Sequence, residues 1–73
     1  MDRRKIKDQI EGIKRDIEHL ENDRISQEMI ERNREVFEIS ETFRRKVEDQ
    51  RQLEDNTIET WTMEIERLKE MMK

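Results

Sequence analysis

The chain has 73 residues, of which 30% are hydrophobic and 49% charged, with a formal net charge of -4 and neither cysteine nor proline. A chain of this length has about 22 apolar side chains, too few to enclose the core of a self-contained globular enzyme. No apolar run is long enough for a membrane span or a signal peptide. The lack of cysteine agrees with an intracellular, cytoplasmic or cytoskeletal location. We therefore expect a protein that works by association.

Helix is favoured at almost every position, and the only glycine, Gly12, costs roughly 1 kcal/mol relative to alanine. Glutamate precedes arginine by four residues at Glu11/Arg15 and Glu41/Arg45, a spacing that stabilises helices. The sequence predicts an all-α fold in which residues 1–73 form a single coiled-coil segment. One continuous helix of that length would measure about 110 Å.

The first predicted stretch carries an apolar stripe with alternating spacings of four and three residues: Ile6, Ile10, Ile13, Ile17 and Leu20. This heptad pattern is typical of a coiled coil. Isoleucine at both core positions also tolerates three strands, whereas the polar seam residues Arg24 and Arg32 favour two.

The middle of the chain follows a different repeat, with apolar residues eleven positions apart at Ile25, Val36, Val47 and Ile58. The seam between them continues through Ile39, Phe43, Gln50 and Glu54. Because eleven-residue repeats relax the left-handed supercoil, we predict a rod that winds at its ends and runs nearly straight through its middle.

Residues 44–57 are the weakest part of this seam, since Val47 and Leu53 are their only apolar side chains. Two interpretations remain open. In the first, the segment has a function as a hinge, a register-setting polar layer or a partner site; in the second, it is a neutral irregularity of the rod. Phe37 lies beside Val36 and off the stripe, so it is either an exposed contact for a second partner or an extension of the seam.

The last stretch returns to heptads at Ile58, Trp61, Ile65, Leu68 and Met72. Its distribution over the core positions favours a parallel two-stranded coil, while the charge blocks along the chain argue weakly for antiparallel strands. Trp61 occupies a seam position, so we interpret it as an internal packing residue in preference to an anchor for a binding partner.

A stripe this narrow is not buried by its own helix, so we expect a second copy to cover it. The predicted interface of this homodimer consists of Ile6, Ile10, Ile13, Ile17, Leu20, Ile25, Val36, Ile39, Phe43, Val47, Ile58, Trp61, Ile65, Leu68 and Met72. One alternative is a lone charged helix. Another is a chain folded back into a three-helix bundle, with breaks at residues 22–26 and 55–57; the lack of glycine or proline at the corners argues against it.

Catalytic residue sets are missing from the sequence. It has one histidine, His19, no cysteine or tyrosine, and only Ser26 and Ser40 as serines, so we expect no enzyme, no cofactor and no metal site. Basic clusters at residues 3–7 and 44–46 are interrupted or flanked by acids in a chain of pI about 5.1, which argues against nucleic-acid and membrane-surface binding.

The pattern is shared by segments of many long coiled-coil proteins, but no motif indicates one family. We predict a structural oligomerisation segment that dimerises and spaces attached domains, as in cytoskeletal, motor, tether or centrosomal scaffold proteins. Because the stripe extends close to both ends, we expect a piece of a longer rod. The alternative function is a helical module that docks a different protein through Phe37 and residues 44–57.

Overall fold

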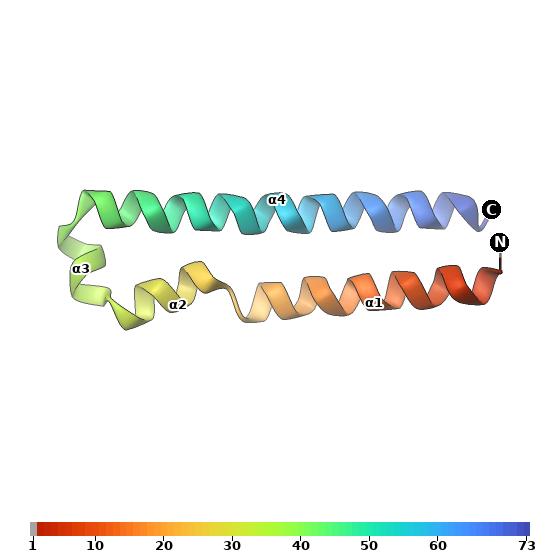
Figure 1. The fold of residues 1–73 in the computed structure, drawn as a ribbon, viewed down its shortest axis with the longest axis horizontal. Coiled ribbons are helices and arrows are strands. Elements are labelled where there is room, and N and C mark those ends of the chain that lie inside the picture. Colours follow the sequence, from red (N-terminus) through yellow and green to blue (C-terminus); the bar gives the residue numbers. More distant parts are fainter. Residues whose placement is uncertain (1) are drawn as a thin grey trace.

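The computed structural model describes residues 2–73, which form four helices and no strand: α1 (Arg3–Asn22), α2 (Ile25–Arg32), α3 (Arg34–Ile39) and α4 (Glu41–Met71). The predicted all-α fold is confirmed for these residues. Figure 1 shows α1 and α2 running antiparallel to α4, with α3 at the turn and both chain ends at the opposite end. The molecule is an elongated hairpin with principal extents of 53 × 16 × 11 Å.

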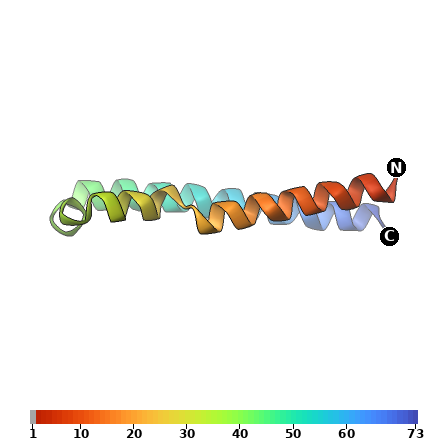
Figure 2. The same cartoon turned by 90° about the horizontal axis from the view of Figure 1, so that it is seen from below.

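The prediction of one continuous helix is wrong, because the chain bends at Asp23, Asn33 and Ser40 and folds back on itself. Of the two breaks in the folded-back alternative, the first occurs and the second does not. Helix α4 runs through residues 55–57 for 31 residues without interruption. One arm of the hairpin is therefore a single helix and the other is jointed, as Figure 2 also shows.

Short polar side chains end and restart the helices. The Asp2 carboxylate accepts a hydrogen bond from the Arg4 backbone N–H at 3.0 Å, which caps the start of α1. The Ser40 hydroxyl accepts one from the Phe43 N–H at 3.2 Å and caps α4. Such caps satisfy N–H groups that have no partner inside the helix.

The corner forms without glycine or proline because α3 divides the reversal into separate bends. Asn33 and Ser40, on either side of α3, have φ values of -130° and -104°, and none of residues 2–73 has a positive φ. Any L-residue adopts these angles. The composition of the corner was therefore no obstacle to a hairpin.

The core lies between α1 and α4 near the open end. Ile6, Ile10, Ile65 and Leu68 are buried, and Ile13, Ile17 and Met72 pack against them. The two heptad stripes of the sequence thus face each other within one chain. The chain thus covers this part of its own stripe with antiparallel arms, so the burial of these residues does not require a second copy.

Candidate interaction surface

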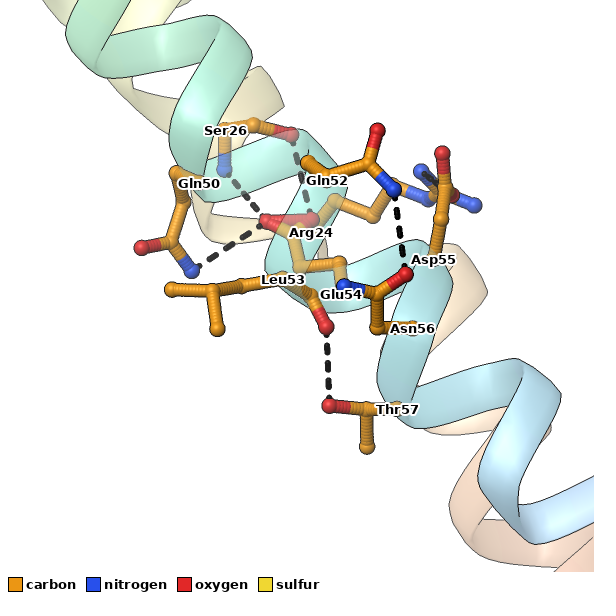
Figure 3. Close-up of polar contacts among 9 residues, drawn as sticks. All are labelled: Arg24, Ser26, Gln50, Gln52, Leu53, Glu54, Asp55, Asn56 and Thr57. Atoms are coloured by element: carbon orange, nitrogen blue, oxygen red, sulfur yellow. Dashed lines mark hydrogen bonds and ion pairs between the residues drawn. The ribbon is translucent and has the colours of Figure 1, made fainter.

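A buried polar cluster joins the two arms at the middle of the hairpin. Glu54 of α4 is 3% exposed, and its two carboxylate oxygens accept hydrogen bonds from the Ser26 backbone N–H at 2.9 Å and the Ser26 hydroxyl at 3.1 Å. The Gln50 amide lies 3.5 Å from the same carboxylate (Figure 3). We call Ser26, Gln50 and Glu54 the polar clasp.

The polar clasp exists because α2 begins without a cap of its own. Its N-cap residue is Arg24, whose side chain makes no capping hydrogen bond. Glu54 of the other arm supplies the missing acceptor, and its negative charge lies at the positive end of the helix dipole. The seam residues Gln50 and Glu54, whose partner the sequence left open, thus meet α2 at a defined register.

An ion pair lies beside the clasp. A terminal guanidinium nitrogen of Arg24 is 2.8 Å from the Asp55 carboxylate, and both side chains remain partly exposed. Within residues 2–73, every buried side-chain nitrogen or oxygen has a hydrogen-bond partner. The cluster thus ties together the joint between α1 and α2 and the midpoint of α4, and its carboxylate is fully engaged in doing so.

The hairpin has two unlike faces, which can be assigned from helical spacing around the facing residues. In two antiparallel helices that face each other, the residues at i-1 and i+3 from each facing residue lie on the same face of the pair. Counting from Glu54 gives Leu53 and Thr57, and counting from Ser26 gives Ile25 and Met29. Figure 3 shows Leu53 and Asp55 extending to opposite sides of α4.

The first face, which we call the apolar face, is hollowed near the open end of the hairpin. A shallow groove there is lined by residues of both arms: Gln9, Gly12, Ile13, Asp16, Glu64 and Leu68. Toward the turn, the same face continues through an uncharged region that we call the midspan patch: Leu20, Ile25, Met29, Leu53, Thr57 and Thr60. Ile25 is 53% and Leu53 61% exposed.

The second face, which we call the charged face, carries the Arg24–Asp55 ion pair. Arg51 and Thr62 lie four residues before and seven after Asp55, so they share its side of α4. The half-buried Ile30 and Ile58 lie close to the line where the arms meet. The exposed apolar side chains near the clasp therefore belong to the other face.

The predicted interface residues separate into three groups. Ile6, Ile10, Val47, Ile65 and Leu68 are buried in the hairpin itself. Half-buried positions are held by Ile13, Ile17, Leu20, Phe43, Ile58, Trp61 and Met72. The exposed group comprises Ile25, Val36 and Ile39, the last at 83%. The seam thus forms the inner side of the hairpin over most of its length but leaves that side at the start of α2 and in α3.

Sequence reasoning missed three residues of the surface. Met29, Thr57 and Thr60 are not among the predicted seam residues, and the sequence indicates Leu53 only as an apolar residue of a weak segment. Their signal is the i-1 and i+3 spacing around Ser26 and Glu54, which has meaning only once these two residues are known to face each other.

Phe37 lies beside residues of the 44–57 segment, with which the sequence analysis groups it as an alternative docking site. Phe37 is half-buried and lines a small open hollow together with Arg44, Val47, Glu48 and Arg51. One lining residue, Val47, is buried, and three others are charged. Phe37 is thus packed against the start of α4 and is not a freely projecting contact.

The remaining chemistry-bearing residues are dispersed. The His19 side chain is 84% exposed and lies 3.9 Å from the Asp23 carboxylate. Residues 2–73 include no group of three or more histidine, cysteine or acidic residues positioned to hold a metal ion. None of the described helices has both the length and the apolar character needed to cross a membrane. The chain matches no protein-family model, no curated protein and no solved structure.

Proposed function

We propose that the hairpin is a self-association module and that two copies pair to hold attached segments together. The observation that carries this proposal is the accessible surface of 6109 Å² for a chain of 9.2 kDa. A folded monomer of that mass exposes about 4,900 Å² on average. The excess, roughly 1,200 Å², exceeds the roughly 800 Å² that each partner of a standard interface buries.

The small core supports the same proposal, because only five hydrophobic residues among 2–73 are buried. Each arm of the hairpin covers the apolar stripe of the other arm, but the residues on either side of both stripes remain exposed to solvent. A four-helix bundle formed by two hairpins would cover one flank on each copy. The homodimer expected from the sequence is therefore retained as a proposal, with two hairpins in place of two continuous parallel strands.

The position of the chain ends defines what such a dimer would do. Residues 2 and 73 lie at the same end of the hairpin (Figure 1). Segments attached to the two ends of one copy would leave that copy side by side, so each hairpin would keep its own two attached segments together and dimerisation would join them to those of the second copy. This role, in an intracellular scaffold of the cytoskeletal, motor, tether or centrosomal kind, is the function we propose.

Sedimentation equilibrium combined with circular dichroism tests the proposal. We expect a helical protein with the mass of a dimer at micromolar concentration and a Tm that rises with protein concentration, because association stabilises the folded state. A monomer mass and a concentration-independent Tm across the micromolar range would contradict it.

The second candidate function is docking of a different protein at the hollow that contains Phe37. The observation that favours it is that Phe37 and residues of the 44–57 segment line one hollow, whose charged lining consists of two arginines, Arg44 and Arg51, and one acid, Glu48. These two arginines favour an acidic helix as the partner. A monomeric chain that binds an acidic amphipathic helix, with binding lost in Phe37→Ala, would support this function over self-association.

A further inference from the structure

We infer that the second copy docks on the apolar face, with the midspan patch at the centre of the interface; this inference rests on the proposed self-association. The free energy of burying the charged face in an interface is less favourable than that of burying the apolar face. Covering the charged face would bury Arg51 and the Arg24–Asp55 ion pair, whose side chains are now partly in water. Covering the apolar face would bury Ile25 and Leu53, which are more than half exposed.

The threonines of the midspan patch make it more apolar than its composition suggests. The Thr57 hydroxyl donates to the Leu53 carbonyl and the Thr60 hydroxyl to the Asn56 carbonyl, both at 2.9 Å. Because the single donor of each hydroxyl is already paired within α4, burying these side chains leaves no donor without a partner. Their methyl groups are then available for contact with an apolar partner.

The lack of charge in the midspan patch indicates a second copy as the occupant. A two-fold axis brings each residue near it against the same residue of the partner, so any charge there would meet its like. All six residues of the midspan patch are uncharged, whereas Asp16 and Glu64 lie further along the face beside the groove. A charged partner of another sequence would require no such neutral centre.

Gly12 supplies a separate observation on the same face. A Cβ added at Gly12 would meet no atom within 4 Å, so the packing of this chain does not require glycine there. Yet glycine within a helix is destabilising by roughly 1 kcal/mol relative to alanine. Gly12 lines the groove of the apolar face, and close approach of a second backbone at the groove would account for it.

Two threonines of α4 provide a matched test. Thr60 belongs to the midspan patch and Thr62 to the charged face; both are exposed, and both hydroxyls donate to the carbonyl four residues earlier. We expect Thr60→Lys to weaken dimerisation roughly tenfold or more, because it buries a charge at the interface. Thr62→Lys, which adds the same charge two residues away, should change the dimerisation constant less than about twofold.

Sedimentation equilibrium of the three proteins, with circular dichroism to verify helicity, distinguishes the outcomes. A monomeric wild-type chain overturns the proposed function itself. A dimeric wild type with both variants equally affected, or with only Thr62→Lys affected, overturns the choice of face while leaving self-association standing.

Maleimide alkylation gives a readout that does not depend on tolerance of a lysine, since the chain has no cysteine of its own. Thr60→Cys should react several-fold more slowly at concentrations where the chain is dimeric than where it is monomeric, and Thr62→Cys should react equally at both. Equal protection of the two sites, or none at Thr60→Cys in a confirmed dimer, would overturn the inference.

Discussion

The Ser26–Glu54 contact is the most specific interaction between the two arms at the scale of single residues. Both side chains are almost wholly buried, and they lie 28 residues apart in the sequence. A buried carboxylate is costly unless its oxygens are paired, and here both are paired with one residue of the facing helix. The contact therefore opposes a slip of one arm along the other.

Glu54→Ala should destabilise the hairpin by about 1–3 kcal/mol, because it leaves the buried Ser26 N–H and hydroxyl without their acceptor. Glu59→Ala is the matched control, since Glu59 is an exposed glutamate of the same helix and its loss should change stability by less than about 0.5 kcal/mol. Urea unfolding followed by circular dichroism measures both. Equal stability of the two variants would show that the clasp is absent in solution.

Gly12→Ala should raise the stability of the monomeric chain by up to about 1 kcal/mol, because the added methyl group enters open space and alanine favours helix. Thermal melts at concentrations where the chain is monomeric measure the effect. Glu11→Ala, at an exposed neighbour in the same helix, serves as the control; it also removes the Glu11/Arg15 pair and should not raise the Tm. A lower Tm for Gly12→Ala would mean that the glycine has a role inside the hairpin.

At the scale of elements, the corner depends on capping instead of on glycine. Asn33 and Ser40 interrupt what is otherwise a helix-favouring sequence between α2 and α4. Their replacement removes the polar side chains that favour a helix end, which brings the two arms closer to a single continuous helix. The difference in free energy between the hairpin and an extended form thus depends on a few residues that favour helix ends at the corner.

The double variant Asn33→Ala/Ser40→Ala should increase the population of an extended chain that exchanges arms with a second copy. Small-angle scattering after size-exclusion chromatography should then give a longest dimension well above the 53 Å extent of the hairpin. Glu35→Ala, exposed within α3, is the control and should keep the hairpin dimension. An unchanged dimension in the double variant would show that arm packing alone determines the fold.

The helical character of the chain could be predicted from the sequence, but the helix ends at Asn33 and Ser40 and the pairing of the arms could not. The spacing of Ile6 to Leu20 and of Ile58 to Met72 correctly indicates two apolar stripes on helices. A heptad stripe accepts a partner stripe from its own chain or from another, so spacing alone does not choose between a hairpin and a rod.

The candidate site was even less accessible from sequence. The polar seam at Gln50 and Glu54 was noticed, but its partner, Ser26, is fixed only by the hairpin register. Likewise, Thr57 and Thr60 can be assigned to a surface shared with Ile25 and Met29 only when the pairing of the arms is known. The break that the sequence allows at residues 22–26 occurs at Asp23, whereas the one it allows at residues 55–57 does not occur, because α4 continues through them.

At the scale of the whole molecule, the hairpin fold predicts a short distance between residues near the two ends of the chain. Lys7 and Lys69 lie in antiparallel arms whose axes pack side by side, so dyes at these positions should be roughly 10–20 Å apart. In one continuous helix they would be about 93 Å apart.

Single-molecule energy transfer between dyes on Lys7→Cys and Lys69→Cys should therefore be high at picomolar dilution, where only single chains are present. Both positions avoid the apolar face, so the labels leave the proposed dimer intact. Dyes on Lys7→Cys and Glu38→Cys, which place one label near each end of the hairpin, provide the low-transfer control. Low transfer in the first pair at this dilution would exclude the hairpin as the fold of the single chain.

The jointed arm and the unbroken arm differ in how they open. Helix α4 has 31 residues of uninterrupted amide hydrogen bonds, whereas the opposing arm is divided at Asp23 and Asn33 into segments that can detach in turn. Amide protons of α2 and α3 will therefore exchange with solvent first, those of α1 later and those of the C-terminal half of α4 last. Helix α4 thus acts as the rigid arm, and local detachment of the jointed arm, α1 to α3, precedes global unfolding.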